Sequence, residues 1–161
     1  MNERDTGAYD LSCETDFATG CSMFFTRQAL EDVGLLDPRF FMYFEDAEWC
    51  VRARRRGYRI RYTPASVINH HVSASTKIDS PLYLYFTMRN KLLLVRMHAP
   101  GKSIFLNLPY FLYFYGRQFI RMGLKWRSWK GVRAIWWGII DGMFMRTGSN
   151  GEGRLGRLQA Q

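Results

Sequence analysis

Three acidic residues, Glu45, Asp46 and Glu48, follow directly after a run of five bulky apolar residues, 40–44. A carboxylate beside apolar side chains can have a shifted pKa, and such a group is a candidate base for removing a proton from a hydroxyl. Because five bulky side chains in succession cannot all be buried in one small loop, we expect some of them to line a cleft. The alternative is structural: acids in the first turn of a helix stabilise it, and Glu48 can pair with Arg52 one turn later.

A histidine pair, His70 and His71, offers a second kind of chemistry, a contact to a metal ion or a phosphate. A single histidine is more often structural or merely exposed, so the ligand role is the less common alternative. No further histidine or cysteine stands at the spacing of a zinc motif, and a closed zinc site is therefore not expected. A hard cation that is bound mainly by substrate phosphates needs one or two protein ligands.

Basic residues stand out at two places. The run 54–56 lies at the end of an expected helix, and we interpret it as a solvated face that complements the helix dipole. Arg89 and Asn90 interrupt an otherwise apolar helix. Because a buried Arg–Asn pair must find polar partners, phosphate is one candidate partner.

Capping residues, glycines and apolar periodicity predict the elements that hold the acidic residues and His70. In the first 79 residues we expect a loop over 1–17 and a buried strand over 17–25. Two helices should follow: one over 27–33, capped by Thr26 and ended by Gly34, and one from Glu45 or Asp46 to about Arg56, ended by Gly57. A half-exposed strand over 58–62 and an extended piece at 67–68 complete this part.

The remainder of the chain is predicted to be helical. A serine followed by a proline is a strong helix start, and a glycine-rich segment argues against a packed tail. We expect a helix from Pro81, capped by Ser80, to about Met97, two further helices at about 102–122 and 128–145, and disorder from Thr147.

The net charge of +9 over 161 residues is unevenly distributed. Residues 1–88 hold ten Lys/Arg against twelve Asp/Glu, whereas residues 89–161 hold thirteen against two and are also rich in aromatic residues. A cationic and aromatic segment favours an anionic lipid surface as its partner. A nucleic-acid-binding protein is a second alternative, but nucleic acid is not expected as a partner because no reader motif accompanies the charge.

Features of the sequence also bear on location. Three cysteines without a CxxC pair are predicted to be reduced, which suits the cytosol. The start of the chain does not resemble a signal peptide. The apolar run 104–115 is short for a spanning helix, which needs about 20 apolar residues, so we expect it to lie on a membrane.

These patterns together resemble the family 2 glycosyltransferases of the GT-A fold, and among them the bacterial rhamnosyltransferase-like branch. The segment 43–48 with Arg52 and 57–58 is similar to the family's acid-pair signature, and the resemblance covers about residues 6–148. The matching segments, in chain order, are 19–23, 33–41, 43–58, 62–75, 83–90 and 138–142.

The resemblance implies a role for each matching residue. Asp46 would be the general base of an inverting displacement, and Glu45 would orient the acceptor. His70 would contact the divalent metal, Mg2+ or Mn2+, or the donor diphosphate, and Arg89 would face that diphosphate or a lipid-linked acceptor. The residues expected to line the acceptor side of the cleft are Gly20, Cys21, Phe41, Tyr43 and Glu48.

One departure from the family is large. The chain has no Asp-x-Asp metal motif and no glycine-rich phosphate loop, so we expect the donor-binding half to be absent and Met1 to fall inside a larger gene product. The metal would bind only together with that half.

The predicted fold is α/β. A partial GT-A catalytic domain over 1–79 would be followed by a basic, aromatic, membrane-associated helical region over 80–146 and a disordered tail over 147–161. The expected activity is transfer of a sugar, such as rhamnose from dTDP-rhamnose, to a lipid-linked or polysaccharide acceptor of the cell envelope. It would take place at the cytoplasmic face of the cell membrane. The alternative is a non-catalytic module that binds the membrane surface.

Overall fold

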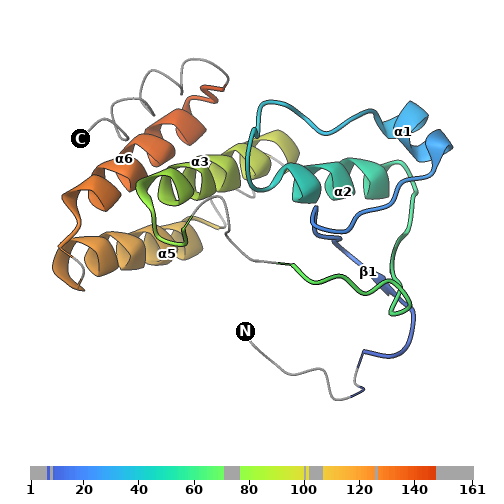
Figure 1. The fold of residues 1–161 in the computed structure, drawn as a ribbon. Coiled ribbons are helices and arrows are strands. Elements are labelled where there is room, and N and C mark those ends of the chain that lie inside the picture. Colours follow the sequence, from blue (N-terminus) through green and yellow to red (C-terminus); the bar gives the residue numbers. More distant parts are fainter. Residues whose placement is uncertain are drawn as a thin grey trace. The chain divides into compact units, whose positions relative to one another are not determined.

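A small antiparallel sheet and a series of helices make up the described part of the chain (Figure 1). The computed structural model describes residues 7, 9–70, 77–99, 101, 107–125 and 127–147. The chain divides into two compact units: the first unit is residues 1–37 with 45–72, and the second unit is residues 38–44 with 73–161. The elements, in chain order, are β1 (Cys13–Thr15), α1 (Arg27–Val33), α2 (Glu45–Arg55), β2 (Ile60–Tyr62), α3 (Pro81–His98), α5 (Leu108–Ile120), the π-helix η1 (Arg121–Lys125) and α6 (Trp129–Met143).

Both helices of the first unit begin and end as their sequences predict. The hydroxyl of Thr26 accepts a hydrogen bond from the backbone N–H of Ala29 at 3.1 Å, which caps α1. Gly34 and Gly57 follow the two helices with φ of 86° and 85°, a conformation that glycine adopts without strain. The two helices pack through a small apolar cluster whose buried members are Ala29, Val33, Trp49 and Ala53.

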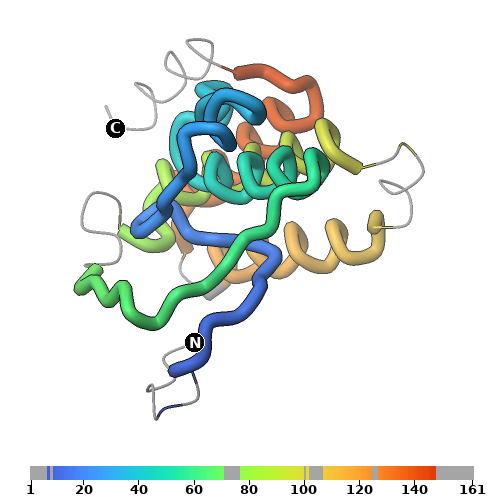
Figure 2. The backbone as a smooth tube through the Cα atoms, turned by 90° about the vertical axis from the view of Figure 1, so that its right-hand side faces the viewer, coloured from blue at the N-terminus to red at the C-terminus, as the bar shows by residue number. Residues whose placement is uncertain are grey.

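The sheet of the first unit consists of β1 paired antiparallel with β2, and Glu14 lies opposite Arg61. Figure 2 traces the backbone of the chain as a tube coloured along the sequence. The predicted strand over 58–62 is therefore confirmed for its last three residues. The prediction of a loop throughout 1–17 is wrong at β1. The prediction of an extended piece at 67–68 is also not met, because these residues are irregular and exposed.

The prediction of a buried strand over 17–25 is wrong. The segment is irregular, with a turn at Gly20 and Cys21. Its backbone donors have side-chain partners instead of a neighbouring strand: the N–H of Ala18 points to the sulfur of Cys50 at 3.5 Å, and the N–H of Gly20 donates to Asp46 at 2.8 Å. Backbone groups that α2 satisfies in this way are not available for a strand ladder.

The second unit is built on the close packing of α6 against α3 (Figure 1). A Cβ atom at Gly138 would lie 2.6 Å from the carbonyl oxygen of Tyr85, and one at Gly142 would lie 2.7 Å from that of Arg89. The two helix backbones can approach this closely because these positions of α6 carry no side chain. Asp141, on the same face, is buried and accepts a hydrogen bond from the Tyr85 hydroxyl at 2.9 Å.

The helices of the second unit confirm the predicted helical region where the structure describes it. Ser80 caps α3 by accepting from the N–H of Tyr83 at 3.2 Å, with Pro81 in the first turn. The predicted helix at 102–122 corresponds to α5 and η1, and the predicted helix at 128–145 corresponds to α6. Residues 102–106 and the tail from 148 lie outside the described residues, as does His71.

No helix among the described residues is both long and apolar enough to cross a membrane. The broad prediction of a mixed α and β fold is confirmed. The predicted domain boundary after residue 79 stays a prediction.

The glycine contacts lead to a test of the α3–α6 packing. Gly138→Ala and Gly142→Ala should each lower the free energy of unfolding by about 2 kcal/mol, because the added methyl group meets backbone and not a flexible side chain. Gly116→Ala in α5, where a Cβ would meet nothing within 4 Å, should be neutral or stabilising by up to about 1 kcal/mol. Urea denaturation followed by circular dichroism measures all three, and equal effects at the three positions would contradict the close packing.

Candidate active site

The carboxylate of Asp46 is anchored at the start of α2. Its Oδ2 accepts from the backbone N–H of Gly20 at 2.8 Å, and its Oδ1 accepts from the N–H of Ala47 at 2.7 Å. The side chain is partly exposed, and each oxygen keeps a further lone pair. The structure therefore brings Asp46 and the turn at Gly20 and Cys21 together, two features that lie 26 residues apart in sequence.

Cys21 completes this turn. Its side chain is exposed and its sulfur lies 2.6 Å from the hydroxyl oxygen of Thr19. All three cysteines of the chain are free in this structure, and their reduced state stays a prediction. Cys50 differs from the other two because it is buried, and burial raises the pKa of its thiol.

Glu45, the first residue of α2, is partly buried. Burial raises the pKa of its carboxyl above the ordinary value; the backbone N–H of Glu45 opposes this, and the charge of Asp46 raises the pKa further. One of its oxygens, Oε2, is buried without a hydrogen-bond partner. Since buried polar atoms are rarely left unsatisfied, this oxygen is suited to a ligand hydroxyl or a water molecule.

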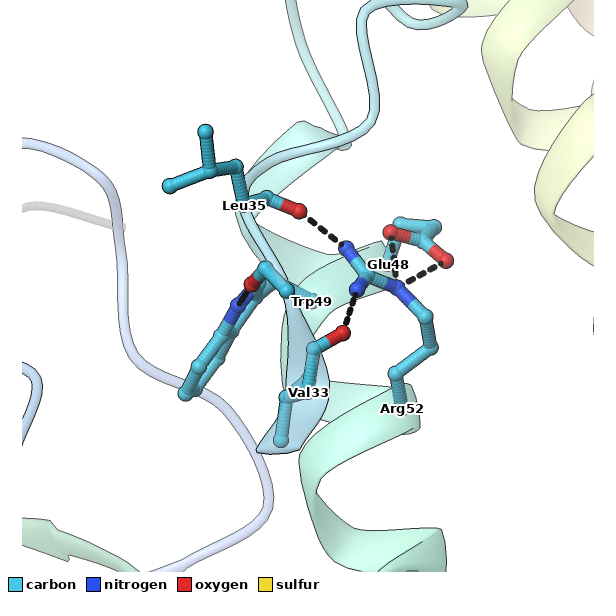
Figure 3. Close-up of polar contacts among 6 residues, drawn as sticks. Val33, Leu35, Glu48, Trp49 and Arg52 are labelled. Atoms are coloured by element: carbon cyan, nitrogen blue, oxygen red, sulfur yellow. Dashed lines mark hydrogen bonds and ion pairs between the residues drawn. The ribbon is translucent and has the colours of Figure 1, made fainter. Parts of the chain in front are cut away.

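Glu48 has a structural role, which corrects its prediction as a cleft-lining residue. Its exposed fraction is 0%, and both of its oxygens accept from Nε of Arg52, at 2.8 and 2.9 Å (Figure 3). The alternative of an ion pair one helical turn apart was the correct interpretation. A side chain without exposed surface does not face an open cleft.

Arg52 uses its remaining donors to hold the end of α1. Its Nη1 donates to the carbonyl oxygen of Val33 at 2.5 Å and its Nη2 to that of Leu35 at 2.8 Å (Figure 3). Trp49 adds a hydrogen bond from its indole N–H to the carbonyl of Gly34 at 2.7 Å. Carbonyls at a helix end have no partner within the helix, so α2 supplies the partners that α1 lacks. The sequence showed the Glu48–Arg52 spacing but gave no sign of these carbonyl partners.

The aromatic loop, residues 39–44, lies in the second unit and ends directly before Glu45. Phe40 is fully buried, whereas Phe41 is 69% exposed with its ring centre 5.3 Å from that of Phe86. The ring of Tyr43 contacts that of Tyr83 edge to face at 5.3 Å. Phe41 is therefore exposed, and the predicted role of Phe41 and Tyr43 in lining a cleft stays a prediction.

Arg89 has different partners from the diphosphate that was predicted for it. It is 2% exposed, its Nε donates to Oδ1 of Asn90 at 2.8 Å, and its Nη2 donates to the carbonyl oxygens of Arg39 and Phe40 at 2.8 and 2.9 Å. Burial lowers the pKa of its guanidinium. In this structure the group is enclosed by its own chain and does not face a donor.

His70 is exposed on an irregular segment that follows β2. In the parts of the chain that the structure describes, no three His, Cys, Asp or Glu side chains come together as a metal-binding group. The predicted contact of His70 with a metal ion or a diphosphate therefore stays a prediction.

A surface hollow of about 330 Å³ lies elsewhere on the first unit, lined by Asp32, Arg56, Gly57 and Tyr58. These residues lie at the far end of α2 from Asp46, about 15 Å along the helix at 1.5 Å per residue. The hollow is therefore not the expected acceptor cleft.

A family model described as "Glycosyltransferase like family 2" matches residues 3–92, which is more than half of the chain. The chain belongs to this family. The matched region contains Gly20, Asp46, Glu48, Arg52 and Arg89.

Curated relatives carry related functions in their names. The chain is 33% identical over 79 residues to "Low-salt glycan biosynthesis hexosyltransferase Agl10" of Haloferax volcanii, covering 48% of this chain and 26% of that protein. It is 29% identical over 84 residues to "dTDP-rhamnosyl transferase RfbF" of Shigella flexneri, covering 47% and 28%. It is 33% identical over 66 residues to "N-acetylglucosaminyl-diphospho-decaprenol L-rhamnosyltransferase" of Mycobacterium tuberculosis, covering 41% and 22%.

The matches thus span about a quarter of the length of each relative. No solved structure matches the chain significantly. The chain is thus a member of a glycosyltransferase family, and one of its relatives is named as a hexosyltransferase of glycan biosynthesis.

The Arg52 contacts lead to a stability test. Arg52→Met should lower the free energy of unfolding by about 3 kcal/mol, because it removes the guanidinium that pairs with the buried Glu48 carboxylate and donates to two carbonyls. Arg54→Met, two residues away, removes a pair whose side chains are 51% and 83% exposed, and should change stability by less than about 1 kcal/mol. Thermal and chemical denaturation compare the two variants, and similar losses for both would show that Arg52 contributes no more than a surface charge.

Proposed function

We propose that Asp46, Glu45 and the turn at Gly20 and Cys21 form the acceptor side of a GT-A-type glycosyltransferase site. The observation that carries the proposal is the anchoring of Asp46: a backbone N–H 26 residues earlier holds one carboxylate oxygen while the side chain stays partly exposed. A base has to be fixed in orientation and still reach its substrate, and this arrangement meets both needs.

In the proposed reaction Asp46 accepts the proton of an acceptor hydroxyl as the hydroxyl oxygen attacks the anomeric carbon of the sugar. The bond from that carbon to the nucleoside diphosphate breaks, and the configuration inverts. Glu45, whose pKa is raised by burial, hydrogen-bonds the acceptor and orients it.

The leaving diphosphate gains negative charge that needs a positive partner. A divalent cation, Mg2+ or Mn2+, would supply that charge when bound, with His70 as one ligand. The chain itself contains no Asp-x-Asp sequence. We therefore assign the rest of the donor and metal site to a donor-binding half that corresponds to the remainder of the relatives' length.

The proposed substrates follow the names of the relatives. Two of the three described above are rhamnosyltransferases, and one of these names a lipid-linked diphosphate acceptor. We assign to this chain a nucleotide-diphosphate sugar donor, such as dTDP-rhamnose, and a lipid-linked or polysaccharide acceptor of the cell envelope. A lipid-linked acceptor places the enzyme at the cytoplasmic face of the membrane.

The exposed face of α6 supports a membrane contact and also the alternative function, a non-catalytic membrane-surface module. Trp129, Arg133 and Trp136 recur at the spacing of one helix face, and all three are exposed. Tryptophan and arginine side chains on one face suit the interface of a bilayer that contains anionic lipid. The opposite face of α6 carries the glycines that pack on α3.

Asp46→Asn tests the catalytic proposal. The chain is expressed together with a donor-binding half, and transfer of labelled sugar to a lipid-linked acceptor is followed alongside donor binding. Loss of the base should lower kcat at least about 100-fold while donor affinity changes little. Asp16→Asn, a change of the same kind at a residue whose side chain is 83% exposed, is the control and should remain active. Wild-type turnover by Asp46→Asn would overturn the assignment.

Vesicle co-sedimentation tests the membrane contact. The chain should sediment with vesicles that contain phosphatidylglycerol more than with vesicles of phosphatidylcholine alone, and Trp129→Ser with Trp136→Ser should weaken this binding at least about tenfold. Phe24→Ser with Leu35→Ser, which removes two exposed apolar side chains from the first unit, is the matched control. Equal loss in both double variants would contradict a specific role for α6, and binding without any sugar transfer would favour the non-catalytic module.

A further inference from the structure

One face of α2 contacts an irregular segment of the same unit, residues 16–20. Three side chains of α2 that are spaced four residues apart contact three residues of the segment that are spaced two residues apart. The contacting pairs are Asp46 with Gly20, Cys50 with Ala18, and Arg54 with Asp16. Residues four apart share one face of a helix, so the segment lies along α2 and runs in the opposite direction.

The two spacings match in length. Four residues of an α-helix rise about 6 Å, and two residues of an extended chain advance about 6.6 Å. In an extended chain successive N–H groups point to opposite sides, so those of Ala18 and Gly20 face α2 together. A shift of the segment by one residue would turn both N–H groups away from the helix. The contacts therefore define one register of the segment on α2.

The middle contact of the three is sheltered from water. Cys50 is 1% exposed, and its sulfur lies 3.5 Å from the backbone nitrogen of Ala18 and 3.9 Å from the carbonyl oxygen of the same residue. The thiol can accept from that N–H and donate to that carbonyl. Burial raises the pKa of the thiol, which keeps the proton on the sulfur for the second of these bonds.

The outer contact is different because it is open to solvent. Arg54 and Asp16 form an ion pair at 2.7 Å, but their side chains are 51% and 83% exposed. Such a pair contributes little to stability. It marks the direction of the segment, whereas the buried Cys50 is suited to hold it.

The inner contact reaches the proposed base. Of the two hydrogen bonds described above for Asp46, one comes from the next residue of α2, Ala47, and the other from Gly20. A Cβ atom at Gly20 would lie 3.5 Å from Oδ2 of Asp46, so the segment lies directly against this carboxylate. The bond from Gly20 is the one that ties the carboxylate to a part of the chain outside α2.

We infer that Cys50 is a positioning residue: it fixes the register of the 16–20 segment on α2, which places the N–H of Gly20 at the Asp46 carboxylate and orients that group. The catalytic meaning of this inference rests on the proposed function, whereas its geometric claim stands on the hydrogen bonds alone. Misplacement of a catalytic group by about 1 Å can cost about 100-fold in rate, so such a role is large enough to measure.

The backbone amide of Gly20 is a direct reporter, because its N–H donates to Asp46. We compare its resonance in the 1H–15N spectrum of the full chain in the wild type and in Cys50→Val, which fills the site with a side chain that neither donates nor accepts. Asp46→Ala supplies the reference position for a Gly20 amide that has lost its acceptor. In Cys50→Val the Gly20 resonance should move toward that reference by about half of the full change or more, because the neighbouring Ala18 has lost its partner.

Two further variants separate positioning from general destabilisation. Cys50→Ser keeps a group that can both accept and donate, and should leave the Gly20 resonance closer to its wild-type position than Cys50→Val does. Cys13→Val makes the same change at an exposed cysteine of β1 and should leave Gly20 unchanged. Should Cys50→Val fail to fold, Cys50→Ala takes its place with the same expected direction.

An unchanged Gly20 resonance in folded Cys50→Val or Cys50→Ala would overturn the inference. Equal shifts in Cys50→Val and Cys50→Ser would also overturn it, since the hydrogen bonds to Ala18 would then not set the register. Neither readout depends on sugar transfer, so this failure is distinguishable from that of the proposed function.

The transfer assay with a donor-binding half gives a second readout. Cys50→Val should lower kcat at least about tenfold with little change in KM for the donor, and Cys50→Ser should retain more of the activity. A rise in KM at constant kcat would contradict a positioning role.

Discussion

The buried guanidinium of Arg89 sets the strongest constraint on the second unit, because a charged group removed from water has to be surrounded by hydrogen-bond partners. Backbone carbonyls of the aromatic loop and the side-chain oxygen of Asn90 are those partners. The aromatic loop in turn depends on these side chains. Its carbonyls need hydrogen-bond donors, and its aromatic residues with left-handed backbone conformation need contacts that keep them in place. The glycines of α6 complete the arrangement by letting α3 be packed closely from the other side.

The first unit solves a similar problem with Arg52. There the guanidinium binds carbonyls at the end of α1 and is neutralised by the buried carboxylate of Glu48. Both arginines join segments that lie far apart in sequence by binding main-chain oxygens. The planar guanidinium has several donors in fixed directions and can bind two or three oxygens at once, which a lysine ammonium does not do with the same geometry.

Sequence reasoning located the elements that local signals determine. Thr26, Ser80, Gly34 and Gly57 act as helix starts and stops because their effect depends on one turn of backbone. The prediction failed at 17–25, where Asp46 and Cys50 accept hydrogen bonds from the backbone N–H groups of Gly20 and Ala18. It also failed at Arg89, which was expected to contact a ligand and instead binds carbonyls of the aromatic loop. Tertiary partners decide these cases, and the identity of such partners is not written in the neighbouring residues.

The three acidic residues at the start of α2 differ in whether their carboxylates stabilise the fold or are suited to contact a substrate. Glu48 is fully buried and committed to Arg52, so its charge is used within the protein. Glu45 has a raised pKa and a buried oxygen without a partner, which suits a hydrogen bond to a substrate better than the role of a base. Asp46 is oriented by the Gly20 amide and keeps accessible lone pairs. Of the three, it alone combines a fixed direction with a partly exposed side chain that has no ion-pair partner among the contacts described above, and the proposed role as a base requires both orientation and exposure.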